Sequence, residues 1–122
     1  GIASAGQAFL FDRNGQNPIT YDNPNPIVNG NFAVSVAPAG NEQFLIGAIR
    51  NSSGDQNLRD GQVFLFDKQS TEPLQTYNNP NPDAAFIGSI GSGLIRAQNF
   101  GVSVAAIGDN SIIVGAPAHY KL

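Results

Sequence analysis

The sequence contains the same strand-like pattern twice. Residues 6–12 read Gly-Gln-Ala-Phe-Leu-Phe-Asp, and residues 61–67 read Gly-Gln-Val-Phe-Leu-Phe-Asp. Residues 31–37, Asn-Phe-Ala-Val-Ser-Val-Ala, return at 99–105 with one change, as Asn-Phe-Gly-Val-Ser-Val-Ala. Self-similarity at a period of roughly fifty residues, carried by short apolar segments, is typical of propellers and other repeat arrays whose units are not stable alone. The chain is therefore expected to fold as a series of similar units.

The composition favours short strands joined by tight turns. Hydrophobic residues make up 41% of the 122 residues, which is enough for a core and too many for a disordered tail. The 14 glycines and 8 prolines fall, with many asparagines, between the apolar runs. No stretch repeats apolar residues at helical spacing over three turns, so we expect an all-β protein with almost no helix.

The same composition excludes several classes of partner. Charged residues make up 12% of the chain and the formal net charge is −3, so no basic stripe is available to bind nucleic acid. No apolar run approaches the roughly 20 residues that cross a bilayer, and the first residues lack the parts of an export signal. We expect a soluble, mature or excised segment. The absence of cysteine excludes disulfides, thiolate zinc sites and thiol nucleophiles.

Alignment of the two copies predicts four types of strand. They cover residues 7–12 and 62–67, residues 19–22 and 74–78, residues 32–37 and 100–105, and residues 43–48 and 111–116. Strands of the first and fourth types are continuous apolar runs, which indicates that both faces are covered. In the third type, valine alternates with alanine, glycine or serine, so one face is small. A small face lets a neighbouring sheet approach closely, and we expect this strand nearest the axis of a radial array.

Two further segments suggest where a ligand could bind. The sequence Asn-Pro-Asn-Pro at 23–26 and 79–82 ends the second strand type, because proline removes donors from the sheet. Tyr21 and Tyr77 precede these turns and are expected to be exposed, where their rings could stack on sugars, or else simply cap outer strands. The second copy is longer by an insertion within residues 83–98, and insertions into repeats map to loops. Ile90, Ser92 and Arg96 in it are further candidate ligand-binding residues.

The end of the chain resembles a known repeat. Residues 99–105 are followed by Gly-Asp-Asn at 108–110 and Val-Gly-Ala-Pro at 114–117. This succession resembles the FG-GAP repeat of integrin α-subunit propellers and of many bacterial surface and secreted proteins. In the bacterial versions the motif is typically followed by two further strand motifs, and residues 61–67 and 76–80 look like both. The first copy departs from the pattern, with Ala33 in place of the glycine and Ile49 in place of the proline.

The resemblance implies a β-propeller built from blades of four antiparallel strands. In that family the Phe-Gly strand is the innermost of a blade and the Gly-Ala-Pro strand is second. Residues 1–26 would then form an outer half-blade, 31–82 a complete blade, 83–98 an inserted loop and 99–122 an inner half-blade. Such a segment leaves strand edges unpaired, which proteins avoid. Either it belongs to a longer propeller, or copies of the chain complete each other's blades around a ring.

Metal binding and catalysis find little support in the sequence. The hairpins that correspond to the calcium loops of integrins are too short to supply the six to eight oxygens of a calcium site, and the Asp-Arg-Asn-Gly sequence at 12–15 is explained equally well by a β-turn. His119, the single histidine, has no acidic partner nearby in sequence. Asp55 and Asp60 are expected to be solvated, and residues 51–53, Asn-Ser-Ser, form a glycosylation sequon on an expected loop.

These observations predict a non-enzymatic propeller segment without a cofactor. The resemblance implies a binding, adhesion or structural role through protein–protein contacts at the cell surface or outside the cell. A carbohydrate-binding, lectin-like propeller is the alternative among binding proteins. A hydrolase on a propeller is the rival from another class, and it is disfavoured because no nucleophile–base or metal constellation is evident.

Overall fold

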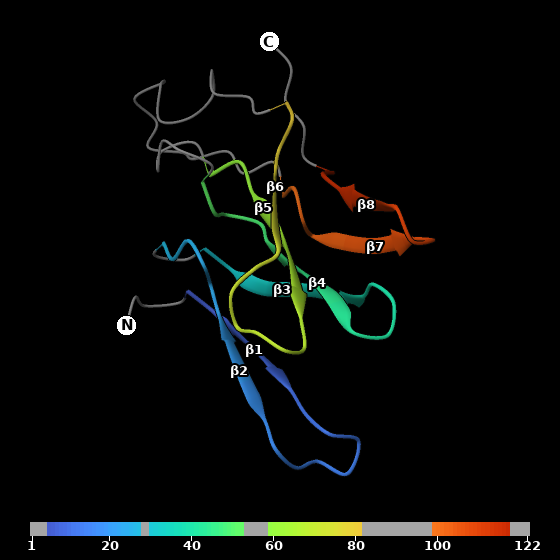
Figure 1. Ribbon diagram of the computed structural model, residues 1–122. Helices are drawn as coiled ribbons and strands as arrows, with labels where there is room; N and C mark the ends of the chain where they lie inside the picture. Colours follow the sequence, from blue (N-terminus) through green and yellow to red (C-terminus); the bar gives the residue numbers. More distant parts are fainter. Residues whose placement is uncertain (1–4, 28–29, 53–58, 82–98, 118–122) are drawn as a thin grey trace.

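The computed structural model describes residues 5–27, 30–52, 59–81 and 99–117. All elements of regular secondary structure within these ranges are β-strands. The strands follow in the order β1 (Gln7–Leu10), β2 (Ile19–Asp22), β3 (Phe32–Pro38), β4 (Gln43–Ala48), β5 (Gln62–Asp67), β6 (Gln75–Asn78), β7 (Ser103–Ile107) and β8 (Ser111–Gly115). They form an antiparallel four-stranded sheet, β3-β4-β5-β6, and two hairpins, β1-β2 and β7-β8 (Figure 1). The expected all-β fold with a four-stranded antiparallel unit is confirmed.

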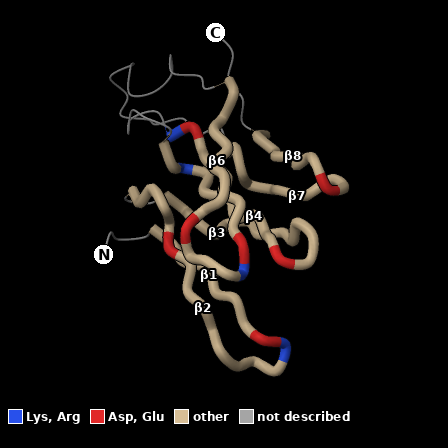
Figure 2. Tube along the Cα trace, viewed as in Figure 1, with Lys and Arg blue, Asp and Glu red and all other residues tan. Residues whose placement is uncertain are grey.

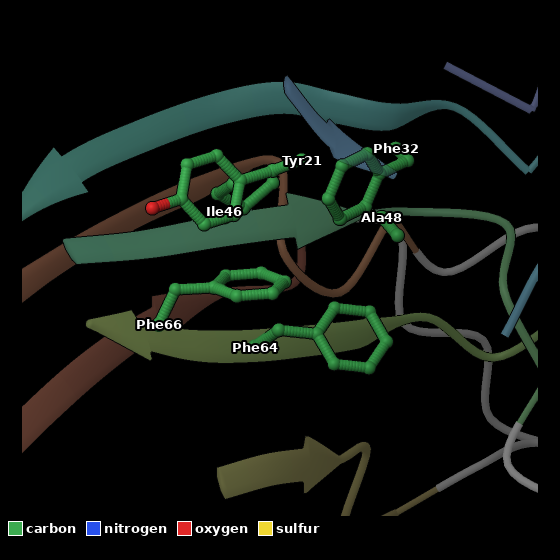
Figure 3. Packing of buried hydrophobic residues seen from close by; sticks show 6 residues of the cluster. All are labelled: Tyr21, Phe32, Ile46, Ala48, Phe64 and Phe66. Atoms are coloured by element: carbon green, nitrogen blue, oxygen red, sulfur yellow. The ribbon is translucent and has the colours of Figure 1, made fainter. Parts of the chain in front are cut away.

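The four-stranded sheet is the central layer, and each hairpin packs on a different face of it (Figure 1). On one face, Phe64 and Phe66 of β5 lie with Ile46 of β4 against Tyr21 of the first hairpin (Figure 3). On the other face, the second hairpin covers a cluster centred on Leu45 and Val63. Because successive side chains of a strand point to opposite faces, the continuous apolar runs of β4 and β5 supply both clusters at once.

Strand boundaries differ from the predicted ones where turns compete for the backbone. β1 ends at Leu10 because the Asp12 amide donates to the carbonyl of Gln16 at 2.9 Å and closes the hairpin loop. β7 begins at Ser103 instead of residue 100, because the Val102 amide donates to the carbonyl of Asn99 in a turn. The predicted strands 74–78 and 111–116 are each shorter by one residue in the structure.

The small face of β3 receives a neighbouring strand, as its sequence predicts. Ser35 and Ala37 are half-buried, whereas Val34 and Val36 on the opposite face are exposed. Ser35 Oγ donates a hydrogen bond to the carbonyl of Gly101, and β3 contacts β7 along this face. A larger residue at position 35 would hold the second hairpin away from the central sheet.

Equivalent positions of the two repeats share an uncommon backbone conformation. Ala33 has a φ of 71°, and its counterpart Gly101 has a φ of 96°. Glycine adopts this left-handed region without steric penalty, whereas for a residue with a Cβ this conformation costs roughly 1–2 kcal/mol of conformational free energy. The first repeat accommodates alanine next to a β-bulge between Phe32 and Ser35, and the methyl group packs on the buried cluster around Phe32.

This pair predicts an asymmetric response to substitution. Gly101→Ala should lower the free energy of unfolding by about 1–3 kcal/mol, because the new Cβ would lie 3.1 Å from the Gln62 carbonyl oxygen and 3.2 Å from Val63 Cγ2 in a left-handed conformation. Ala33→Gly should change the free energy of unfolding by less than about 1 kcal/mol. Glycine relieves the backbone strain of the folded state, but the methyl contact is lost and the unfolded chain gains conformational entropy, so the effects largely cancel. Urea denaturation of both variants measures the contrast, and equal effects would contradict it.

Charged residues lie mostly in the turns and at strand ends, so the strands themselves contain few of them (Figure 2). The turn after β1, the β3–β4 turn and the β7–β8 turn hold several of them. Within the described ranges, no helix is long and apolar enough to span a membrane.

Candidate functional site

Tyr21 belongs to the core, and the prediction that its ring is exposed is wrong. Only 1% of the residue is exposed. Its ring meets those of Phe44 and Phe66 edge to face, with centroids 5.0 Å and 5.1 Å apart. The sequence around Tyr21 does not reveal this burial, because the sheet that covers the ring is formed by residues distant in sequence. A buried ring leaves no face for a sugar to stack on.

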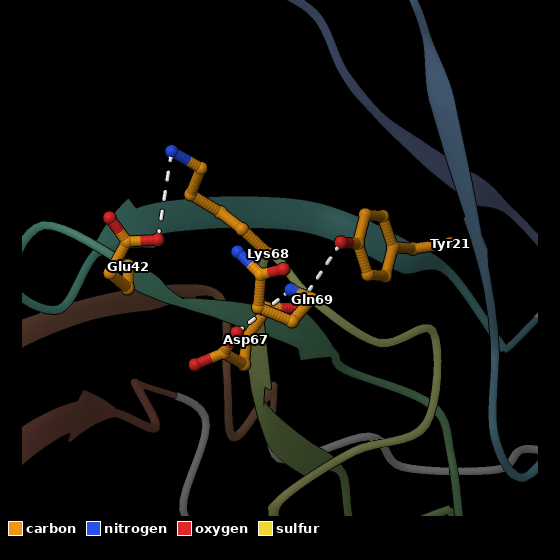
Figure 4. Close-up of polar contacts among 5 residues, drawn as sticks. All are labelled: Tyr21, Glu42, Asp67, Lys68 and Gln69. Atoms are coloured by element: carbon orange, nitrogen blue, oxygen red, sulfur yellow. Dashed lines mark hydrogen bonds and ion pairs between the residues drawn. The ribbon is translucent and has the colours of Figure 1, made fainter.

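The hydroxyl group of Tyr21 connects the first hairpin to the end of β5. It donates to the carbonyl oxygen of Asp67 at 3.3 Å, where the Asp67 carboxylate also accepts from the Gln69 amide (Figure 4). Nearby, Lys68 Nζ lies 3.8 Å from a carboxylate oxygen of Glu42 at the surface. Burial raises the pKa of Tyr21, and the negative charge of Asp67 raises this pKa further.

This pKa shift predicts a loss of stability in alkali. The folded state holds the phenol proton more strongly than the unfolded state does. The contribution of this phenol to the free energy of unfolding is therefore complete below about pH 10, and it is lost as the pH rises through the raised pKa. The free energy of unfolding of the unmodified protein should therefore fall above about pH 10 relative to that of Tyr21→Phe. Urea titrations of both proteins from about pH 8 to about pH 11 measure it, and parallel pH profiles would contradict it.

Tyr77 is the candidate tyrosine that keeps some exposure. It is half-buried in β6 opposite Val63, where it packs on the cluster of Leu45 and Val63. The other candidates, Ile90, Ser92 and Arg96, lie outside the described residues, as do His119 and Asp55. Of the five predicted ligand-binding residues, the described ranges contain Tyr21 and Tyr77, which belong to different clusters on the two faces of the central sheet.

A buried network of side-chain amides joins the first hairpin to the central sheet. Asn23 and Asn51 exchange two hydrogen bonds of 2.8 Å, and both residues are buried. The Gln62 side-chain oxygen accepts from Asn25 at 3.0 Å and from Asn51 at 3.2 Å, while its amide nitrogen donates to Asn78 at 2.8 Å. The Asn-Pro-Asn-Pro segment therefore does more than end a strand, because its asparagines anchor the turn to the next layer.

The burial of two side chains differs from what the sequence predicts. Asn51 is 0% exposed and its amide nitrogen is engaged twice, so this residue of the sequon is not accessible for glycosylation in the folded protein. Asp60 is 2% exposed instead of solvated. The sequence signal for the network was the repeated asparagine, which propensity alone assigns to turns.

Truncation of the network should be costly. Asn51→Ala leaves the buried side-chain nitrogen of Asn23 without its acceptor and removes a donor from the Gln62 side-chain oxygen, and we expect the free energy of unfolding to fall by about 2–3 kcal/mol. The exposed Asn41, in the β3–β4 turn, offers a matched control, since Asn41→Ala should change stability by less than about 0.5 kcal/mol. Thermal or urea unfolding measures both, and a similar small effect at the two positions would refute the structural role.

Two clefts lie where the hairpins border the central sheet. A first cleft of about 340 Å³ lies between β1 and the β3–β4 pair, and its walls include Leu10, Val36 and Phe44. A second cleft of about 340 Å³ lies between the β5–β6 pair and β8, with Leu65, Tyr77 and Ile112 in its walls. Both clefts therefore lie beside a strand at the edge of a two-stranded sheet.

Comparison of the repeats shows how much apolar surface these edges leave open. Phe9 and Phe11 are each 55% exposed, whereas Phe64 and Phe66 at the same repeat positions are 1% and 0% exposed. Ile113 is 58% exposed, whereas its counterpart Leu45 is 0% exposed. The prediction that all these apolar runs are covered on both faces holds for β4 and β5 and is wrong for β1 and β8, because each hairpin has one sheet neighbour fewer among the described residues.

The described ranges contain no group of three or more histidine or acidic side chains that could hold a metal ion. The Asp12 carboxylate, which sequence reasoning weighed as a calcium ligand, accepts from the Asn17 side chain at 2.7 Å, and the Asp12 carbonyl accepts from Gly15 in the hairpin loop. This arrangement is that of a turn.

No protein-family model matches the sequence, and no curated protein sequence matches it either.

Proposed function

We propose that the chain is a segment of an FG-GAP-type β-propeller that acts through protein–protein contacts and is not an enzyme. The observation that carries the proposal is that one layer-to-layer packing arrangement occurs twice. Leu10 and Tyr21 of the first hairpin pack on one face of the central sheet, and the repeat counterparts Leu65 and Tyr77 pack against the second hairpin. Successive layers related by the same contact are what a radial array of blades requires.

Backbone contacts between the layers repeat in the same way. A Cβ at Gly6 would clash with the carbonyl oxygen of Phe32, and a Cβ at Gly61 would clash with that of Phe100. Both glycines have left-handed φ angles, of 91° and 93°. A glycine whose backbone touches the next layer is thus part of each repeat, which supports a regular stack in preference to a chance arrangement of hairpins.

The exposed apolar surface supports a binding role. Monomeric proteins rarely expose contiguous apolar patches of this kind, and such patches mark interaction sites. The first cleft, whose charged wall residues are Glu42 and Lys68, and the aromatic edge around Phe9 and Phe11 offer apolar contact area. By the resemblance to FG-GAP proteins, the contacts belong at the cell surface or outside the cell. A lectin-like role remains the alternative, since Tyr77 borders Asp109 and Asn110 in the second cleft.

Binding to cells separates these roles. Fluorescently labelled protein should bind saturably to cells, and the binding should be lost after protease treatment of the cell surface and retained after glycosidase treatment. Glycosidase-sensitive binding would instead identify a lectin-like propeller. Absence of saturable binding, or turnover of ester, glycoside or peptide substrates, would contradict the proposal.

A single cleft residue provides the corresponding variant. Val36→Ser should weaken protease-sensitive binding roughly tenfold, because Val36 is 63% exposed in the first cleft and burial of a valine contributes about 1.5 kcal/mol. Leu74→Ser is the matched control, since Leu74 is 52% exposed and does not line either cleft. Equal effects of the two substitutions would show that the first cleft is not the binding surface.

A further inference from the structure

We propose that β8 of one copy of the chain pairs with the free edge of β1 in a second copy, so that the two hairpins form one four-stranded sheet. The inference rests on the proposed function and names the partner of the exposed apolar surface as another copy of the same chain. Among the described residues, β1 is hydrogen-bonded only to β2, and β8 only to β7. Free edges of this kind invite pairing with another strand.

The central sheet shows which register such a pair would adopt. In the β4–β5 pair, the opposed residues are Phe44 and Phe66, Leu45 and Leu65, and Ile46 and Phe64. The counterparts of these residues in β8 and β1 are Ile112 and Phe11, Ile113 and Leu10, and Val114 and Phe9. The repeat therefore predicts Ile113 of one copy opposite Leu10 of the other. A slip by one residue would turn every apolar side chain to the wrong face.

This register fills the first cleft. Leu45 lies on the face of the central sheet that packs against Val104 and Ile112 of the next layer, and it is 0% exposed. The counterparts of Val104 and Ile112 are Val36 and Phe44, which line the first cleft. Ile113, the counterpart of Leu45, would enter that cleft from the partner copy and cover Val36.

The same pairing fills the second cleft from the other side. Phe66 packs against Phe44 and Tyr21, with its ring centroid 5.1 Å from that of Tyr21. Ile112 and Tyr77, the counterparts of Phe44 and Tyr21, line the second cleft. Phe11 of the partner would therefore enter it. The contact between the Tyr21 hydroxyl and the Asp67 carbonyl would recur between Tyr77 of one copy and Asp12 of the other.

Three features favour a second copy over an unrelated strand. By the repeat, β8 corresponds to β4 and β1 corresponds to β5, and β4 and β5 already pair with each other in the central sheet. Neither β1 nor β8 contains a charged residue, so like charges do not oppose each other between these strands. Finally, the two hairpins of one chain lie on opposite faces of the central sheet, so the chain cannot pair its own β1 with its own β8 (Figure 1). The contact is head to tail, and repetition of it generates a ring if the rotation closes.

Disulfide trapping tests both the partner and the register. The chain has no cysteine, so the single variants Leu10→Cys and Ile113→Cys can be mixed and oxidised without competing thiols. We expect a disulfide-linked dimer that contains one copy of each variant. The mixture of Phe9→Cys and Ile113→Cys is the matched control, because these side chains would lie on opposite faces of the shared sheet, and it should link at least tenfold more slowly.

Several results would overturn the proposal. They are equal linking in the two mixtures, linking of each variant mainly to itself, or no linking of proteins whose circular dichroism is native. If the apolar positions do not tolerate cysteine, the exposed pair Asp12→Cys and Ser111→Cys, counterparts of the opposed Asp67 and Gln43, carries the same test. A second readout is the mass of the unmodified chain in sedimentation equilibrium, where a lone 12.8 kDa species at micromolar concentration would also overturn the proposal.

The two proposals fail separately. Cell binding without register-specific linking would leave the proposed function in place and refute the shared sheet. Linking without cell binding would support the shared sheet and remove the proposed role at the cell surface.

Discussion

The structure depends on burial of both faces of the β4–β5 pair. Phe64, Phe66 and Ile46 face the first hairpin, while Leu45 and Val63 face the second, and all five are at most 1% exposed. Each such side chain contributes about 1.5–3 kcal/mol when it leaves water. A two-stranded hairpin is marginal in water by itself, so both hairpins owe their stability to this central pair. The other described strands are therefore stabilised by packing on these two adjacent strands.

A second, localised set of contacts consists of side-chain hydrogen bonds. The amides of Asn23, Asn51 and Gln62 satisfy one another where three segments of the chain meet. Unlike apolar packing, these hydrogen bonds are directional, so they fix how the first hairpin enters the stack. The Tyr21 hydroxyl adds a further directional contact at the opposite end of the same interface. Apolar area thus supplies most of the stabilisation, and the amides and hydroxyl select one arrangement.

A repeat provides an internal standard against which exposure can be judged. An exposed phenylalanine on a surface is ordinary, but Phe9 and Phe11 are exposed at positions where their counterparts are buried. The difference shows how much apolar surface the other described residues leave open, and the clefts beside β1 and β8 contain the counterparts of residues that are in contact elsewhere in the repeat. The proposed binding surface and the proposed interface between copies therefore involve the same residues. That coincidence links the proposed role in protein–protein contacts with the proposed pairing of copies.

The positions of the strands, to within a few residues, and their antiparallel pairing can be predicted from local patterns in the chain. The apolar runs at 62–67 and 43–48, the valine alternation of β3 and the turn residues between them are local signals, and each strand pairs with its neighbour in sequence. What the sequence left open was the environment of single side chains. Tyr21 and Asn51 read as surface and loop residues, because their burial comes from layers that are distant in sequence. Likewise, Phe9 and Phe64 occupy equivalent positions in near-identical motifs, yet Phe9 is exposed and Phe64 is buried, because burial depends on the neighbouring sheet and not on the strand that carries the residue.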